Sequence, residues 1–175
     1  SKHLHLPFQS GNDRVLGEMN RRYTRAHYLE LIEYAKKKIP DLSLTSDVIV
    51  GFPGETYGEF QDTLSLIREV EFTSLFTFIF SPRKGTKAET MPDPVPHAEK
   101  AKWMGELLKV QEEIAARRTA DMRGKTYRVL VEGVSKSDGK WLSGRTDGNV
   151  VIEFSADASL VGTYRTVTVT DTRSW

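Results

Sequence analysis

One run restricts the fold more than any other, namely residues 47–56, DVIVGFPGET. Its β-branched residues predict a strand that is covered on both faces. Two glycines then predict a sharp turn, and Thr56 with Glu59 fits a capping box that starts a helix. The run therefore places loop amides without large side chains at the carboxyl end of a strand, where ligands of α/β folds bind. An ordinary tight turn would explain the glycines alone.

The same order of elements recurs around this run. Alternating residues predict strands at 3–8, 44–50 and 75–80, and helical spacing predicts helices at 14–19, at 24–38 and from about residue 57. Strands that alternate with helices predict parallel strands with right-handed crossovers. Three strands cannot close a barrel, so they form a small open sheet or part of a larger one. We expect chain before Ser1 to cover the first strand, because folds usually cover exposed edges.

The second half of the chain changes character at about Gly124. A long helix is expected from His97 to Arg123, after Pro96 and before that glycine. From residue 125 the hydrophobic period becomes two, with turn residues between short segments, which predicts a small antiparallel β-barrel. The expected domains are therefore residues 1–123 and 124–175, and the fold class is α/β followed by a small β-barrel.

Composition excludes several kinds of site. The chain has 175 residues, a formal net charge of +1 and no cysteine. The absence of cysteine excludes disulfides, thiolate catalysis and any cluster held by thiolates of this chain alone. The charge balance means that a nucleic-acid footprint would have to be local. No apolar run approaches the roughly 20 residues that span a bilayer. We expect a cytoplasmic protein with no membrane partner.

Four motifs in order resemble the radical S-adenosylmethionine (SAM) methylthiotransferase family, and in particular its tRNA methylthiotransferases of the MiaB type. These motifs are HLHLPFQSG (3–11), MNRRYT (19–24), DVIVGFPGET (47–56) and FSPRKGT (80–86). The resemblance extends over essentially the whole chain. It implies that residues 1–123 form the second half of a radical SAM (β/α) barrel, and that residues 124–175 form a TRAM domain, which binds RNA.

The cluster-binding cysteines of that family are not in this chain. The resemblance implies that the full-length protein holds S-adenosylmethionine and two [4Fe–4S] clusters, and that it adds a methylthio group to C2 of an isopentenyl-modified adenosine next to the anticodon. The implied partners are the tRNA anticodon stem-loop, the missing N-terminal part of the protein and an external electron donor. The isolated chain is expected to be inactive, because thiolates must hold the cluster that supplies the electron.

Candidate site residues follow from the strand ends and from the resemblance. The cofactor-binding set is Gln9, Ser10, Asp47, Gly51, Gly54, Glu55, Phe80 and Arg83. The RNA-binding set is Arg21, Arg22, Arg128, Arg145 and Trp141. Tyr164 and Trp175 are further aromatic candidates, and one of the three aromatic residues Trp141, Tyr164 and Trp175 could instead belong to the core. No catalytic residue and no metal ligand is expected. His3 and His5 face one side of a strand, but hydrogen-bonded histidines explain them better than a metal does. Aromatic residues at 72–80 are expected in the core.

Two other functions remain open from the residues alone. The first is a non-enzymatic RNA-binding protein that acts through the small barrel. The second is a small α/β enzyme that binds a phosphorylated metabolite at the amides of residues 51–56.

Overall fold

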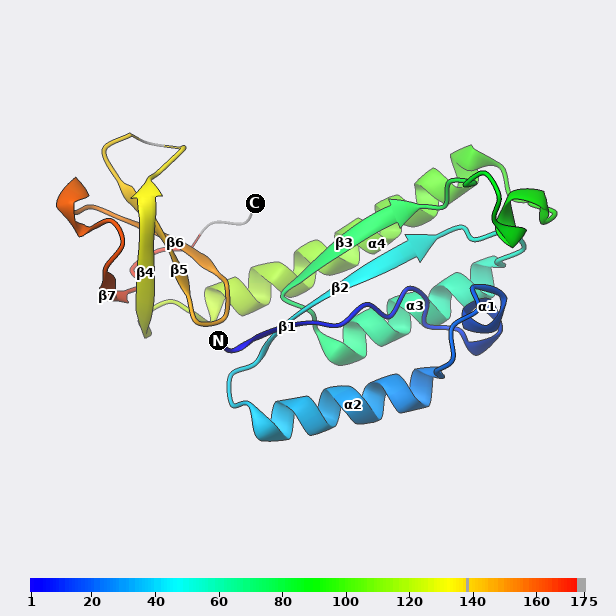
Figure 1. The fold of residues 1–175 in the computed structure, drawn as a ribbon, viewed down its shortest axis with the longest axis horizontal. Helices are drawn as coiled ribbons and strands as arrows, with labels where there is room; N and C mark the ends of the chain where they lie inside the picture. Colours follow the sequence, from blue (N-terminus) through cyan, green and yellow to red (C-terminus); the bar gives the residue numbers. More distant parts are fainter. Residues whose placement is uncertain (138, 173–175) are drawn as a thin grey trace.

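The computed structural model describes residues 1–137 and 139–172, which form two sheets joined by a long helix (Figure 1). Trp175, one of the expected aromatic contacts, lies outside these residues. Nowhere in the described ranges does a helix combine the length and apolar character that a membrane span requires.

The first sheet is parallel and has three strands in the order β1-β2-β3. The strands are β1 (His3–His5), β2 (Ser43–Val50) and β3 (Ser74–Ile79). The helices between them are α1 (Asp13–Glu18), α2 (Arg25–Lys38) and α3 (Tyr57–Val70). The expected alternation and the parallel pairing are both confirmed.

β1 is shorter than the strand expected at residues 3–8. Pro7 has no amide hydrogen, and the Ser46 hydroxyl donates to Leu6 O (2.7 Å) and accepts from Phe8 N (3.0 Å). A side chain thus replaces the regular ladder here. Pairing resumes at Gln9, which bridges Val48 in the parallel sense.

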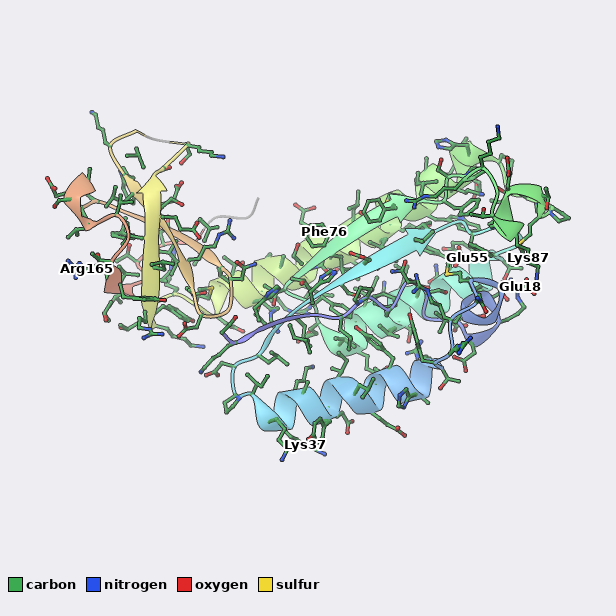
Figure 2. All side chains as sticks on the ribbon, viewed as in Figure 1. Glu18, Lys37, Glu55, Phe76, Lys87 and Arg165 are labelled. Atoms are coloured by element: carbon green, nitrogen blue, oxygen red, sulfur yellow. The ribbon has the colours of Figure 1, made fainter. Side chains whose placement is uncertain are left out.

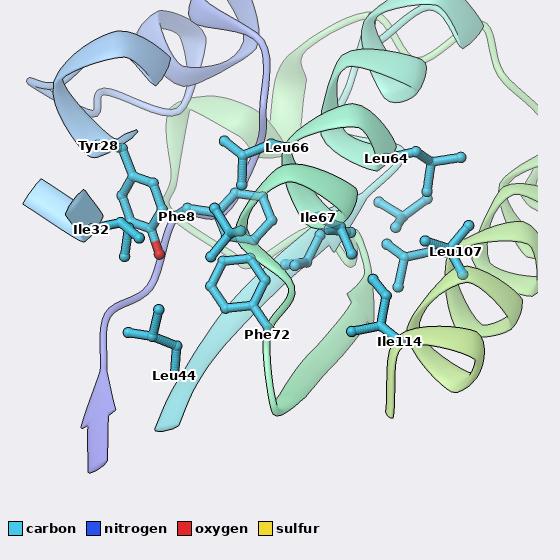
Figure 3. Close-up of a cluster of buried hydrophobic side chains, with 14 of the residues drawn as sticks. Phe8, Tyr28, Ile32, Leu44, Leu64, Leu66, Ile67, Phe72, Leu107 and Ile114 are labelled. Atoms are coloured by element: carbon cyan, nitrogen blue, oxygen red, sulfur yellow. The ribbon is translucent and has the colours of Figure 1, made fainter. Parts of the chain in front are cut away.

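The hydrophobic core lies on one face of the parallel sheet, between β2 and helices α2, α3 and α4 (Figure 3). Phe8 and Phe72 stack with ring centroids 5.4 Å apart, and both are buried. Even-numbered residues of β2, such as Val48 and Val50, point into this core. The odd-numbered residues therefore point to the opposite face, which none of the described helices covers (Figure 1).

Helix α4 (His97–Ala120) runs from the carboxyl end of the parallel sheet to the second sheet (Figure 1). It follows a short 3₁₀ helix, η1 (Lys87–Thr90), and Trp103 of α4 stacks on Phe60 of α3 with centroids 5.4 Å apart. It ends three residues earlier than expected, because Met122 N and Arg123 N make shorter turn bonds to the residues three before them.

The second sheet is antiparallel, with the strand order β6-β5-β4-β7. Its elements are β4 (Thr126–Val134), β5 (Leu142–Thr146), β6 (Val151–Phe154), η2 (Ala158–Leu160) and β7 (Tyr164–Thr168). No ladder joins β7 to β6 among the described residues, so the sheet is open. The expectation of a closed barrel is therefore wrong for the described residues. Four short strands are too few to close around a packed interior.

Thr56 makes the capping box that the sequence predicts. Its hydroxyl accepts from Glu59 N, and the Glu59 carboxylate accepts from Thr56 N at 2.8 Å. A hydrogen bond from Arg14 is the largest of the interactions that lower the pKa of Glu59 to about 2.

We expect Thr56→Ala to lower the free energy of unfolding by about 1–2 kcal/mol, because it removes the cap and loosens the Glu59 contact. Thr24→Ala is the matched control, since Thr24 caps α2 through a single bond to His27 N. Urea unfolding of both variants checks this. An equal or smaller loss for Thr56→Ala would show that the box adds nothing to the cap.

Candidate functional site

A hollow of about 480 Å³ lies on the uncovered face of the parallel sheet. All three strands contribute to it, and so does one residue of the second sheet. Its lining residues are His3, His5, Thr45, Asp47, Phe76, Phe78 and Asn149. The parallel register explains the grouping, because His5 pairs with Thr45, and Asp47 pairs with Phe76. Side chains of paired residues lie on the same face.

The polar groups of the hollow form a connected set. His3 Nε2 and His5 Nδ1 lie 2.9 and 3.0 Å from the Thr45 hydroxyl oxygen. His5 Nε2 is 3.4 Å from Asp47 Oδ1. Within the described ranges, no three His, Asp or Glu side chains are grouped to hold a metal ion. Both histidines contact the Thr45 hydroxyl, which agrees with the expectation of hydrogen-bonded side chains.

Phe76 and Phe78 do not lie in the core, which corrects the expectation for the aromatic residues at 72–80. They are 54% and 53% exposed, whereas Phe72 is fully buried. Figure 2 shows Phe76 standing on β3. His5 meets the ring of Phe76 edge to face at 5.7 Å. The sequence could not reveal this, because β3 carries hydrophobic residues on both faces.

Asn149 reaches the hollow from the turn between β5 and β6. That turn is fixed to the parallel sheet, because Lys2 N donates to Asp147 O at 2.7 Å. A Cβ placed on Gly148 would lie 3.3 Å from Ser43 Cβ, so the two chains are in close contact. Asn149 was not among the expected site residues, since this contact depends on how the two sheets are placed.

The glycine loop at the carboxyl end of β2 is organised by a buried carboxylate. Glu55 is 1% exposed, and its Oε2 accepts from Gly51 N (2.6 Å) and from Phe52 N (3.2 Å). Burial raises the pKa of Glu55 to about 7, against a smaller lowering by the two amides. These amides are the donors that a phosphate would need, so the hypothesis of a phosphorylated metabolite at this loop loses its basis.

Lys100 of α4 closes the other side of this loop. Its side chain is buried, and its ammonium group pairs with Asp93 at 2.5 Å and lies 5.8 Å from the ring centroid of Phe80. The lysine stem packs on Gly51, where a Cβ would come within 2.4 Å of Cδ. Arg14 supports the loop from outside by donating to Gly54 O at 2.9 Å.

The structure places the expected cofactor-binding residues in different surroundings. Ser10, Gly51 and Glu55 are buried, and their polar groups bond within the chain. Asp47 faces the hollow, and Arg83 is exposed in the loop after β3. Gly54, at φ +75°, has open space where a side chain would be. Gln9, at φ 66°, is buried, and Phe80 packs edge to face on Phe52. Their role in cofactor binding stays a prediction.

The expected RNA-binding residues lie at opposite ends of the molecule. Arg21 and Arg22 are exposed between α1 and α2, whereas the other three lie on the second sheet (Figure 1). Arg128 stacks over Tyr164, with its guanidinium carbon 4.6 Å from the ring centroid.

On the second sheet, Arg145 pairs with Glu132, and Trp141 is 42% exposed. Tyr164 is 54% exposed, so neither it nor Trp141 is the core residue that the sequence suggested.

Two family models match the chain. Residues 1–67 match the radical SAM superfamily, and residues 120–175 match the TRAM domain. Among solved structures, the chain is similar to coproporphyrinogen III oxidase (HemN) from Escherichia coli, a radical SAM enzyme. The TM-score is 0.55 at 15% identity, over 97% of this chain and 46% of that one. At that identity the likeness concerns the fold alone.

Similar curated proteins are named tRNA-2-methylthio-N(6)-dimethylallyladenosine synthase. The one from Thermoanaerobacter sp. (strain X514) is 45% identical over 99% of this chain and 37% of its own length. That from Moorella thermoacetica is 47% identical over 99% of this chain and 39% of its own length. That from Caldicellulosiruptor saccharolyticus is 50% identical over 86% of this chain and 32% of its own length. The chain thus spans between about a third and two fifths of these relatives.

Proposed function

We propose, on the premise that this chain joins part of a radical SAM domain to a TRAM domain, that it is the carboxyl-terminal part of a tRNA methylthiotransferase. The reaction would add a methylthio group to C2 of an isopentenyl-modified adenosine next to the anticodon, in the cytoplasm. One observation carries the proposal, namely identity of 45% over 174 residues to a synthase named for that nucleoside.

This chain and the rest of the protein would contribute different residues to the cofactor sites. The chain has no cysteine, so the thiolates for two [4Fe–4S] clusters must come from a preceding N-terminal part. When bound, S-adenosylmethionine and its cluster would supply the radical, with an external electron donor. In this chain, the open backbone at Gly54 and the ring of Phe80 follow the carboxyl ends of β2 and β3 and would contact the adenosine part. Ser10 and Glu55 would act by fixing the loops, because their hydrogen bonds are made internally.

The hollow on the open sheet face would contact a base of the anticodon loop, at the end of the strands opposite the cofactor loop (Figure 2). Two exposed phenylalanine rings offer a stacking surface for a base, and His5 and Asp47 offer polar groups beside them.

The second sheet would bind the phosphate backbone of the RNA. We expect the 175-residue chain to bind an anticodon stem-loop with an affinity that falls as salt rises, because phosphate contacts release counterions. Arg128→Gln should reduce the slope of log K against log salt by about 1. Lys37→Gln removes the same charge from the outer face of α2 and should leave the slope unchanged (Figure 2). Affinity that ignores salt would contradict RNA binding by this face.

Reconstitution distinguishes the proposed enzyme from the alternative, a non-enzymatic RNA-binding protein. The arginines of the second sheet would also support that alternative. The complete reading frame, supplied with iron and sulfide, should show the absorbance of iron–sulfur clusters and should cleave S-adenosylmethionine. The 175-residue chain should do neither. A complete protein that binds the stem-loop but holds no cluster would favour the RNA-binding alternative.

A further inference from the structure

One buried lysine contacts the two loops that follow the carboxyl ends of β2 and β3. Residues 51–56 connect β2 to α3, and residues 80–96 connect β3 to α4. Lys100 lies near the start of α4, at this end of the parallel sheet, and is 3% exposed (Figure 1). A lysine is almost never buried to this extent unless its charge is paired. Its contacts therefore show what the buried charge holds in place.

The stem of Lys100 packs on the glycine loop. A Cβ placed on Gly51 would come within 2.4 Å of Lys100 Cδ and 2.6 Å of Cγ. On its other side, Gly51 N donates to the buried Glu55 carboxylate at 2.6 Å. The backbone at this position is thus held between a lysine stem and a carboxylate.

The ammonium group of Lys100 contacts the loop after β3. It pairs with Asp93 at 2.5 Å and lies 5.8 Å from the ring centroid of Phe80, a distance at which a cation attracts an aromatic ring. The Phe80 ring also packs edge to face on Phe52, with centroids 5.2 Å apart, and it is only partly buried. One charge therefore orients a ring that keeps part of its surface open.

Few other polar contacts hold this loop. Within the described ranges, the hydrogen bonds of residues 81–93 stay inside the loop, apart from that of Asp93. The other ion pair to the rest of the described chain joins Lys87 to Glu18 at 4.0 Å, between exposed side chains. Exposed pairs of this kind contribute little stability. The pair of Lys100 with Asp93 is therefore the main polar anchor of the loop.

Stability alone does not account for a buried ion pair. Replacing such a pair by apolar residues is often neutral or stabilising, because removing charges from water is costly. What the pair provides here is a fixed arrangement of Phe80 beside the glycine loop. These are the groups that would contact the adenosine part of the cofactor, and a binding site requires its contact groups to be held by supporting residues.

We propose that Lys100 is a positioning residue for S-adenosylmethionine. Its ammonium group holds the Phe80 ring and the loop after β3, and its stem holds the loop at Gly51, so that both loops contact the adenosine part together. Lys100 acts through these groups and does not itself touch the cofactor. This inference rests on the proposed function, which supplies the cofactor.

The test measures binding of S-adenosylmethionine to the complete protein, reconstituted with iron and sulfide, by equilibrium dialysis without a reductant. Lys100→Met keeps an unbranched stem and removes the charge, and it should bind the cofactor about 10-fold more weakly. Lys102→Met is the matched control, because the exposed Lys102 of α4 pairs only with Glu99, at 2.9 Å, among the described residues. It should bind the cofactor as wild type does. Asp93→Asn, at the part-exposed end of the buried pair, should show the same selective loss and decides the question if Lys100→Met does not fold.

Two further readouts separate positioning from general damage. In a Phe80→Leu background, Lys100→Met should weaken cofactor binding by less than about 3-fold, because its main route of action is already lost. Cluster absorbance and affinity for the anticodon stem-loop should stay at the wild-type values in Lys100→Met.

Three results would overturn the proposal. They are wild-type affinity for S-adenosylmethionine in Lys100→Met, losses that add fully in the double variant, and a parallel fall of cluster absorbance, RNA affinity and cofactor affinity. Each of them leaves methylthiolation of tRNA by the wild-type protein, and hence the proposed function, standing.

Discussion

Replacing Gly51 with alanine is expected to lower the free energy of unfolding by about 3 kcal/mol. The residue has φ +72°, which costs an alanine about 1–2 kcal/mol. The new Cβ would also come within 2.4 Å of Lys100 Cδ, and that lysine is buried and held by Asp93. Displacing its stem adds an overpacking cost of about 1–3 kcal/mol.

Gly54→Ala provides the matched control for Gly51. Gly54 has φ +75°, but its Cβ would meet nothing within 4 Å, so the expected loss is about 1–2 kcal/mol from backbone strain alone. Urea unfolding of both variants, and of Gly51→Ala in a Lys100→Ala background, separates strain from crowding. Equal losses for the two glycine variants, with no relief in the double variant, would show that Lys100 does not restrict the loop.

The stability of the protein is expected to fall by up to about 3 kcal/mol as pH rises from 4.5 to about 7, because of Glu55. Burial raises the pKa of this carboxyl from 4.5 to about 7, although the amides of Gly51 and Phe52 oppose the shift. Nearby Glu59 also raises the pKa, and Lys100 lowers it. Between these pH values the unfolded chain has lost the proton that the folded chain keeps, so each rise in pH favours unfolding. Below 4.5 the contribution is fully present.

Glu55→Gln should remove this slope, because the amide does not titrate. Measuring the free energy of unfolding of wild type and Glu55→Gln in steps from pH 4.5 to 7.5 isolates the contribution of Glu55 from that of other groups. Glu59, with its pKa lowered to about 2, loses its stabilising charge only in more acidic solution. Parallel curves for the two proteins would contradict the account of a buried, protonated Glu55.

Local chemistry made much of the fold predictable from the sequence. The capping box at Thr56 and the alternation of strands and helices are properties of neighbouring residues, and the structure confirms them. The shortened first strand was not predictable, because a Ser46 hydroxyl from the neighbouring strand replaces its ladder bonds. The prediction of a closed barrel was wrong for a similar reason, since the alternation of residues along a strand does not determine which edge strands pair.

The site was predictable only where it depends on strand ends. The loop at residues 51–55 was expected to be open to a ligand. The buried Glu55 carboxylate instead accepts hydrogen bonds from two of the loop amides, those of Gly51 and Phe52. Phe76 and Phe78 were assigned to the core, because β3 is hydrophobic on both faces and alternation then cannot show which face is covered. Asn149 could not be found, since its place beside His5 results from contact between two sheets far apart in the sequence.

Mass spectrometry of tRNA tests the central claim most directly. The complete protein, reconstituted with iron and sulfide, would be incubated with S-adenosylmethionine, a reductant and tRNA that carries isopentenyladenosine but no methylthio group. The account predicts that digestion yields the 2-methylthio derivative of that nucleoside. Intact clusters and cleavage of S-adenosylmethionine with no methylthio group on the tRNA would contradict it.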